Sequence, residues 1–252
     1  MTLRSILLGG LALAACASAL AQATVKPDGQ FRAAIGLGAS TSSGNSRATN
    51  LSLVADAVRA TEDDKSTLFA NGQYASSSGT TTAERFRLGG RHDHNLGPLM
   101  FVFGGLDFER NKFANLQLRS QLQGGLGYHL IKTSDLSWDL FGGLGYTKDS
   151  YVDPTRIDDA VRTRYSYATL LLAEESTHKL GSNTSFKQRL AVTPNLKNRW
   201  EYRATWDAGL AVAMSSTLNL TVGFSANYNS EPGLGLKSTD TLLTTGVSIK
   251  FD

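Results

Sequence analysis

Three neighbouring residues, His92, Asp93 and His94, are the side chains whose types come closest to a reactive or metal-binding group. A histidine beside a carboxylate is the usual arrangement of a general base. In an extended strand, however, adjacent residues point to opposite faces, so the two histidines share a side from which Asp93 is excluded. His129 and His178 have many serines near them in the sequence but no defining motif. We therefore assign no catalytic residue and expect no enzyme activity.

An acidic segment and a glycine-rich segment are the remaining candidates for binding chemistry. The aspartates between Asp149 and Asp159 could offer oxygen ligands to a divalent cation such as calcium. Such a group is more often solvated, and Arg156 and Arg162 beside it offset its charge. The glycines of 124–127 lie inside a strand pattern and open no helix, so they lack the context of a phosphate-binding loop. We assign no metal site and no cofactor.

The elements that must position these side chains are strands, because apolar and polar residues alternate with a period of two from Gln30 onward. The clearest strand covers 115–131, where leucines share one face and polar residues share the other. The same alternation appears over 135–147 and 199–213, and in two last strands that carry Leu218 to Tyr228 and Leu243 to Phe251. Weaker strands are expected at 30–40, 49–59, 66–75, 83–93, 99–109, 161–173 and 180–193.

Together these segments predict about twelve strands, an even number as in single-chain bacterial barrels. They are longer than the strands of soluble sheets, and about 9–11 tilted residues suffice to cross a hydrocarbon core. The predicted fold is therefore all-β, a closed antiparallel transmembrane β-barrel. The longest connection expected on the outer side of the membrane is Lys148 to Ala160.

Composition agrees with this fold class and excludes others. Hydrophobic residues make up 41% and charged residues 19% of the 252 residues, which is what alternating lipid-facing and lumen-facing positions produce. The formal charge of +3 is small, which argues against a nucleic-acid partner, since binding to nucleic acid usually requires a clustered basic stripe.

The first residues have the pattern of an export signal. Arg4 is followed by the apolar run Ile6 to Ala15 and by small residues that end in Ala19-Leu20-Ala21. We predict a signal peptide over 1–21, a short periplasmic segment over 22–29 and an outer-membrane β-barrel over 30–252. The single cysteine, Cys16, lies in the signal, where Leu13-Ala14-Ala15-Cys16 leaves lipidation as the alternative to cleavage after Ala21. The predicted location is the outer membrane of a Gram-negative cell.

Charged residues mark the strand faces that we expect to point into the lumen, and both signs occur, with bases in excess. Such a lumen is either a water-filled path whose cationic bias attracts anions or a network of ion pairs that fills a narrow barrel. The neighbouring strands place opposite charges side by side, which favours the network. The expected lumen-facing residues are Arg85, Arg87, Arg91, Asp93, Asp107, Glu109, Arg119, Asp139, Arg162, Arg164, Lys187, Arg189, Glu201, Arg203 and Asp207.

The opposite faces are expected to contact outer-membrane lipid. They carry Leu116, Leu118, Leu122, Leu126, Leu130, Trp138, Leu140, Trp206, Leu220 and Phe224. The final strand ends at Phe251, which we expect the outer-membrane assembly machinery to read; barrels usually end in an aromatic residue, whereas here Asp252 follows.

Several short segments together resemble one known family. It is described as salt-induced outer-membrane proteins, the domain of unknown function numbered 481. The resemblance covers roughly 30–251 and is most specific over 107–128; it implies an outer-membrane barrel, without an established substrate or catalytic residue. The segments that carry it are Ser43-Gly44-Asn45-Ser46, Asp107-Phe108-Glu109-Arg110, Leu118-Arg119, Gly124-Gly125-Leu126-Gly127-Tyr128 and Gly142-Gly143-Leu144-Gly145-Tyr146.

The expected function is therefore that of a non-enzymatic integral outer-membrane barrel with a structural or stress-related role. The first alternative is a narrow anion-leaning channel. The second, which the sequence supports less, is an envelope hydrolase built on a barrel scaffold. A soluble β-sandwich would require the Leu116-to-Leu130 face to pack inward against another sheet.

Overall fold

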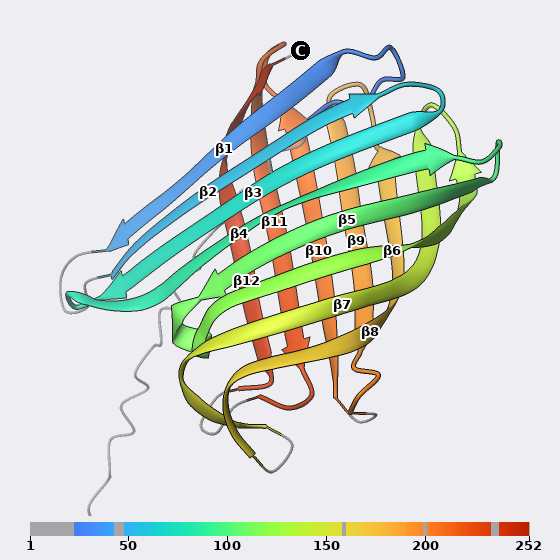
Figure 1. Cartoon of the computed structure of the whole chain (residues 1–252). Coiled ribbons are helices and arrows are strands. Elements are labelled where there is room, and N and C mark those ends of the chain that lie inside the picture. Colours follow the sequence, from blue (N-terminus) through green and yellow to red (C-terminus); the bar gives the residue numbers. More distant parts are fainter. Residues whose placement is uncertain (1–22, 43–47, 158–159, 199–200, 233–236, 252) are drawn as a thin grey trace, which may run out of the picture.

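The computed structural model shows a closed barrel of antiparallel strands (Figure 1). It describes residues 23–251 except 43–47, 158–159, 199–200 and 233–236, so the predicted signal peptide and Cys16 lie outside the described residues. The strands are β1 (Phe31–Ser42), β2 (Ala48–Ala60), β3 (Asp64–Ser77), β4 (Thr80–Asn95), β5 (Met100–Asn111), β6 (Leu116–Lys132), β7 (Leu136–Ile157), β8 (Ala160–Lys179), β9 (Thr184–Pro194), β10 (Tyr202–Ala213), β11 (Leu218–Asn229) and β12 (Thr239–Phe251).

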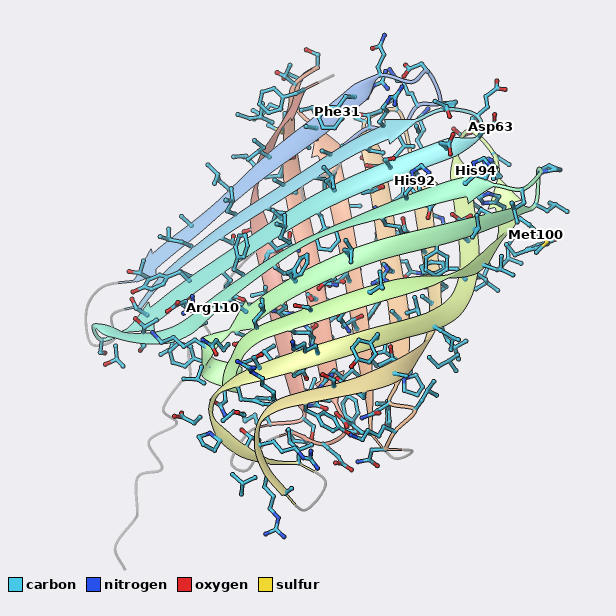
Figure 2. All side chains as sticks on the ribbon, viewed as in Figure 1. Phe31, Asp63, His92, His94, Met100 and Arg110 are labelled. Carbon is cyan, nitrogen blue, oxygen red and sulfur yellow. The ribbon has the colours of Figure 1, made fainter. Side chains whose placement is uncertain are left out.

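Each strand pairs with its sequence neighbours, and β1 pairs with β12 to close the wall. The closing register sets Ala33 opposite Phe251, so the start of β1 and the end of β12 lie at the same end of the barrel. We call this the termini end and the opposite end the far end. In Figure 2, Phe31, His94 and Met100 lie at the termini end and Arg110 lies at the far end. The prediction of twelve antiparallel strands is confirmed.

The connections follow from local turn chemistry. At the far end, β3 and β4 are joined by Ser78 and Gly79, both with positive φ, as a two-residue hairpin turn requires. A 3-10 helix, η1 (Lys112–Ala114), lies between β5 and β6; the side chain of Asn111 caps its start, and Asn115 ends it in the left-handed region. Among the described residues, no helix is long and apolar enough to cross a membrane.

The β7–β8 hairpin differs from its prediction. The segment 148–160 was expected to be a loop, but β7 continues to Ile157 and β8 begins at Ala160. The two strands extend beyond the barrel wall at the far end (Figure 1). A register shift between Ser150 and Thr155 marks the place where the hairpin leaves the regular wall. The continued pairing explains why this long segment is ordered strand.

Alternation divides the wall into two chemically distinct faces. Outward side chains are apolar and exposed, as for Leu122 (59%), Leu144 (64%) and Val247 (47%). Inward side chains at the alternating positions include buried polar groups such as Asp107, Thr147 and Asp149. This arrangement, with apolar residues outside and polar residues inside, is the reverse of that in a soluble barrel.

Candidate functional site in the barrel lumen

The inner wall collects most of the charged residues that were expected there. Arg85, Arg87, Arg91 and Asp93 alternate along β4 with the exposed Phe86, Leu88, His92 and His94, and the neighbouring strands continue the pattern. Asp107 and Glu109 of β5, Arg119 of β6, Asp139 of β7, Lys187 and Arg189 of β9, and Arg203 and Asp207 of β10 occupy the same face, as does Glu201 just before β10.

Three expected orientations are wrong. Arg162 and Arg164 alternate with the buried Tyr165 and Tyr167, so they belong to the outer face of β8 rather than to the lumen. Tyr165 and Tyr167 point inward because their hydroxyls join polar groups there. Leu116 was expected to face lipid but is only 3% exposed, since a register irregularity at the start of β6 turns it inward. The other residues predicted to face lipid lie on the outer face.

Several inner-wall charges were missed by the sequence interpretation. They are Arg32, Asp56, Lys65, Asp149 and Glu175. For Asp149 the signal was present, because the alternation of β7 continues past Tyr146 through the buried Thr147. With these additions and without Arg162 and Arg164, the expected excess of basic residues in the lumen disappears.

A buried network of hydrogen bonds and ion pairs lies on the inner wall toward the far end. Asp149 is at its centre. Its carboxylate is fully buried and accepts two hydrogen bonds from Arg119, at 2.7 and 2.8 Å. Arg203 of β10 lies 3.6 Å from the same carboxylate and donates a hydrogen bond to the Tyr167 hydroxyl. Tyr151 also donates to Asp149. The network therefore joins β6, β7 and β8 to β10.

The next groups along the inner wall are paired between adjacent strands. Arg87 contacts Asp107 through a guanidinium nitrogen at 2.7 Å, and Arg85 donates to Glu109 at 2.8 Å. Glu109 also lies 3.8 Å from Arg119, which links these pairs to the network around Asp149. Charge-assisted hydrogen bonds of this kind hold long side chains in one geometry.

Arg91 occupies an aromatic cage. Its guanidinium carbon lies 4.0 Å from the centre of the Phe141 ring and 4.6 Å from that of Phe103, and its Nε donates to Asp93 at 2.5 Å. Phe101, Phe103 and Phe141 form a buried apolar cluster with Leu171 and Ala191. A desolvated cation over aromatic faces is favourable. This cluster fills the lumen against β5, β7, β8 and β9.

Charges on opposite walls also act on one another. Lys187 of β9 lies 3.5 Å from Glu175 of β8 and interacts electrostatically with Asp56 of β2. Lys65 of β3 contacts Asp93 at 3.3 Å and interacts with Glu175. Since β2 and β3 are separated from β8 and β9 by several strands on either side of the ring, these electrostatic interactions act across the lumen.

The inner wall is unequal around the ring. The inner faces of β4 to β8 carry long, aromatic or charged side chains, and we call them the filled half. The inner faces of β11, β12 and β1 form the smooth half. Between the charged residues at the strand ends, Arg32, Asp240 and Lys250, it carries mainly small uncharged residues: Asn219, Thr221, Gly223, Ser225, Thr244, Gly246, Ser248, Ala34, Gly36 and Gly38.

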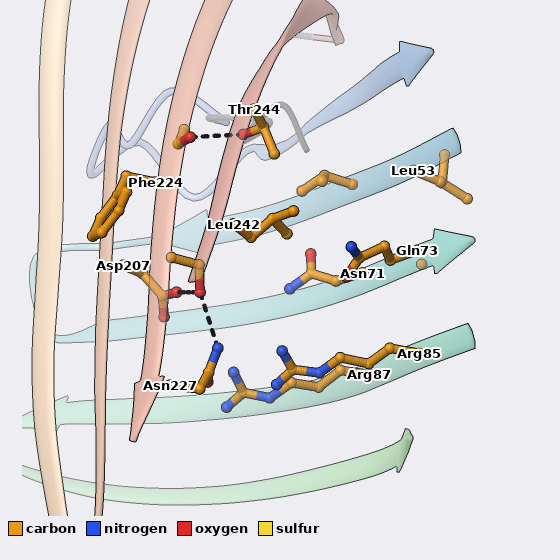
Figure 3. Close-up of a pocket in the computed structure, with 14 residues that line it drawn as sticks. Leu53, Asn71, Gln73, Arg85, Arg87, Asp207, Phe224, Asn227, Leu242 and Thr244 are labelled. Carbon is orange, nitrogen blue, oxygen red and sulfur yellow. Dashed lines mark hydrogen bonds between the residues drawn. The ribbon is translucent and has the colours of Figure 1, made fainter. Parts of the chain in front are cut away.

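A cavity of about 70 Å³ lies between the two halves (Figure 3). Arg85 and Arg87 extend into it from the filled half toward Asp207 and Asn227 (Figure 3), and Ser225 donates to Asp207 at 2.6 Å. A water molecule needs about 10–15 Å³ of such space, whereas ligand pockets measure about 300–1,000 Å³. The cavity therefore suits a few waters rather than a nutrient-sized solute.

The segment before β1 enters the lumen at the termini end. Gly29 has a positive φ that reverses the chain, and Ala23 packs against the inward Ala34 and Val54 of the smooth half and of β2. Arg32 donates two hydrogen bonds to Asp28, at 2.8 and 2.5 Å. These bonds hold the pKa of the Asp28 carboxyl well below its usual range. The segment narrows the lumen at this end.

The two histidines first considered for chemistry lie on the outer face at the termini end. His92 and His94 contact Asp64 at 3.4 and 2.9 Å, while Asp93 points inward, as the alternation predicts. No cluster of three or more metal-ligating side chains occurs within the described part of the chain. Asp149 is bound to arginines inside the barrel, and Asp158 and Asp159 lie outside the described residues.

Comparisons with known proteins identify a family and several solved structures that are similar to the chain. A search among curated proteins finds no match. Solved structures with a similar barrel include the translocator domain of the autotransporter NalP from Neisseria meningitidis, with 13% identity, a TM-score of 0.48, and coverage of 88% of each chain. The KdgM porin has 11% identity and a TM-score of 0.47 over 88% of this chain and 100% of its own. For the NanC porin the values are 13% and 0.45, over 87% and 97%.

The family model described as "Protein of unknown function, DUF481" matches residues 35–251, which include all of the wall except the first residues of β1. The chain therefore belongs to the DUF481 family.

Proposed function

We propose that this protein is an integral outer-membrane β-barrel whose lumen is closed by its own side chains, and that its role in the envelope is structural or stress-related rather than enzymatic. The observation that carries the proposal is the combination of an apolar outer face with an inner face whose charges are paired with one another along the wall. A water-soluble protein would need the opposite arrangement.

The outer face supports insertion in lipid. Its strands reach or exceed the length of about 9–11 residues that crosses a hydrocarbon core: the shortest, β9, covers Thr184–Pro194, and β6 covers Leu116–Lys132. Exposed aromatic side chains occur near both ends of the barrel, where interfacial girdles are found in such proteins. Phe31, Tyr128, Trp138 and Phe251 lie toward the termini end, and Tyr74, Phe108, Tyr146 and Tyr202 lie toward the far end.

Orientation follows from the usual architecture of these barrels, in which both termini are periplasmic. The termini end then faces the periplasm, and the extended β7–β8 hairpin faces the cell exterior. Phe251, exposed on the outer face at the end of β12, is available to the outer-membrane assembly machinery. A cleaved signal peptide over 1–21 would deliver the chain to the periplasm.

Closure of the lumen favours a structural role over transport. The Asp149 network, the aromatic cage of Arg91 and the Lys187–Glu175 pair succeed one another along the interior. The alternative of an anion-leaning channel rested on an excess of inward bases. Charges of both signs balance once Asp56, Asp149 and Glu175 are placed inside, so this alternative loses its electrostatic basis.

Two measurements on the purified full chain test the proposal together. Folded barrels migrate differently before and after boiling, and we expect heat-modifiable migration for protein recovered from the outer-membrane fraction. In planar bilayers we expect no discrete conductance steps from the wild type. The double variant Lys187→Ala/Glu175→Ala is the matched comparison, because it removes both members of one inner-wall ion pair between the adjacent strands β8 and β9. Stable single-channel steps from the wild type would contradict closure.

A further inference from the structure

An acidic side chain, that of Glu174, lies on the outer face among apolar residues. Glu174 belongs to the outward set of β8, alternating with the inward Ala173 and Glu175, and it stands between Leu140 of β7 and Leu190 of β9. If the outer face meets lipid, as proposed above, this carboxylate lies beside hydrocarbon. Ionisable groups in such places are costly and mark functional sites with a partner.

The partners of the outward carboxylates differ. Glu84, near the far end, lies 3.3 Å from Lys112 and 4.0 Å from Arg110. Asp64, near the termini end, contacts His92 and His94. Within the described part of the chain, Glu174 has no basic partner at ion-pair distance, and its hydrogen bond comes from the Trp138 indole N–H at 2.8 Å.

An apolar groove of about 590 Å³ lies directly beside Glu174. Its floor is Gly142, which stands in register between Leu126 and Leu172, so two exposed leucines flank a position without a side chain. Leu140 and Leu190 border the row that contains Glu174. The groove therefore has an apolar lining that can contact an acyl chain, and one carboxylate at its edge.

We propose that this groove binds a phospholipid with a primary ammonium head group, with the ammonium on Glu174 and an acyl chain over Gly142. Charge complementarity selects this occupant, since a primary ammonium both neutralises the carboxylate and donates charge-assisted hydrogen bonds to it. Trp138 has the amphipathic ring that favours the head-group level. Glu174 lies near Lys179, where β8 ends at the termini end, so the lipid belongs to the periplasmic leaflet.

The test is native mass spectrometry of the full chain released from nanodiscs made of equal parts phosphatidylethanolamine, phosphatidylglycerol and phosphatidylcholine. We expect phosphatidylethanolamine to be retained about tenfold over the other two, the effect of about one charge-assisted contact. Glu174→Gln should abolish this preference, and Trp138→Phe should weaken it by leaving the carboxylate less well positioned. Glu84→Gln is the matched control and should leave the preference unchanged.

Two results would overturn the inference. One is equal retention of phosphatidylethanolamine and phosphatidylglycerol by the wild type, which needs no variant to fold. The other is an undiminished preference in Glu174→Gln. Heat-modifiable migration of the same samples separates this inference from the proposed function: a folded barrel without lipid preference refutes only the lipid site, whereas a chain that does not insert refutes both.

Discussion

The filled half and the smooth half of the inner wall differ in the size and charge of their inward side chains. On β4 to β8, long side chains such as Arg87, Arg119 and Tyr167 point into the lumen and contact Asp107, Asp149 and Arg203, respectively. On β11, β12 and β1, residues such as Gly223 and Thr244 keep the wall thin. In the closed lumen that we propose, the filled half supplies long charged side chains and the smooth half leaves the space that they occupy.

This inequality shows where polar groups are essential. In the filled half each charge needs its partner, because a buried ion left alone costs several kcal/mol. In the smooth half, hydroxyls are satisfied locally, as when Thr244 donates to the Gly223 carbonyl at 2.9 Å. Substitutions should therefore be far more damaging in the filled half.

The largest effect is expected for Asp149→Ala. It leaves Arg119 and Arg203 without their shared carboxylate, which should lower the free energy of unfolding by about 3–5 kcal/mol. Thr244→Ala, in the smooth half, should cost about 1 kcal/mol. Urea unfolding in phospholipid vesicles, followed by tryptophan fluorescence, measures both. Equal losses would refute the contrast between the halves.

The smooth half should accept a charge inside but not outside. Val222→Arg on the outer face of β11 should destabilise the barrel by about 2–4 kcal/mol if that position is near the bilayer midplane. Ser225→Arg lines the cavity beside Asp207, where a guanidinium finds a carboxylate, and should cost much less. The same unfolding assay compares them, and a larger penalty at Ser225 would mean that the smooth half has no spare room.

A smaller effect tests how tightly the filled half is packed. A Cβ on Gly127 would overlap the ring of Phe101, so Gly127→Ala must displace that ring and should cost about 1–3 kcal/mol. Gly104, on the neighbouring strand, has open space at its Cβ position, and Gly104→Ala should be nearly neutral. Thermal unfolding of the two variants distinguishes tight packing from a loose interior, for which both would be neutral.

The smallest effect concerns the segment against the smooth half. Hydrogen bonds from Arg32 lower the pKa of Asp28 in the folded chain, so the pair stabilises the fold fully above the ordinary aspartate pKa and is lost only as pH falls through the lowered value. In Arg32→Ala the Asp28 pKa should rise toward the ordinary value of 3.8, with only backbone hydrogen bonds such as that from Gln30 still lowering it. The carboxyl ¹³C shift of Asp28 reports it, and titration of the wild type near 3.8 would show that the pair does not form.

The sequence was sufficient for the wall but not for the contents of the lumen. A period of two identified the strands and separated Leu122 from Gln123, because alternation is a local property. It could not show that Lys187 interacts electrostatically with Asp56, since closure of the barrel makes residues far apart in sequence face the same lumen. Whether Tyr165 or Arg164 points inward also depended on a non-local partner, because Asn195 binds the Tyr165 hydroxyl. Neither could the pattern reveal the bulge that turns Leu116 inward.

The central claim is that lipid contacts the outer face while the inner face is shielded from it. Adjacent single-cysteine variants, Leu122→Cys and Gln121→Cys, test it directly, because the single native cysteine lies in the predicted signal peptide. Each is labelled with a small fluorophore and inserted into vesicles that contain brominated phospholipid. We predict strong quenching at position 122 and little at position 121. Equal quenching at both, or the reverse order, would contradict the account.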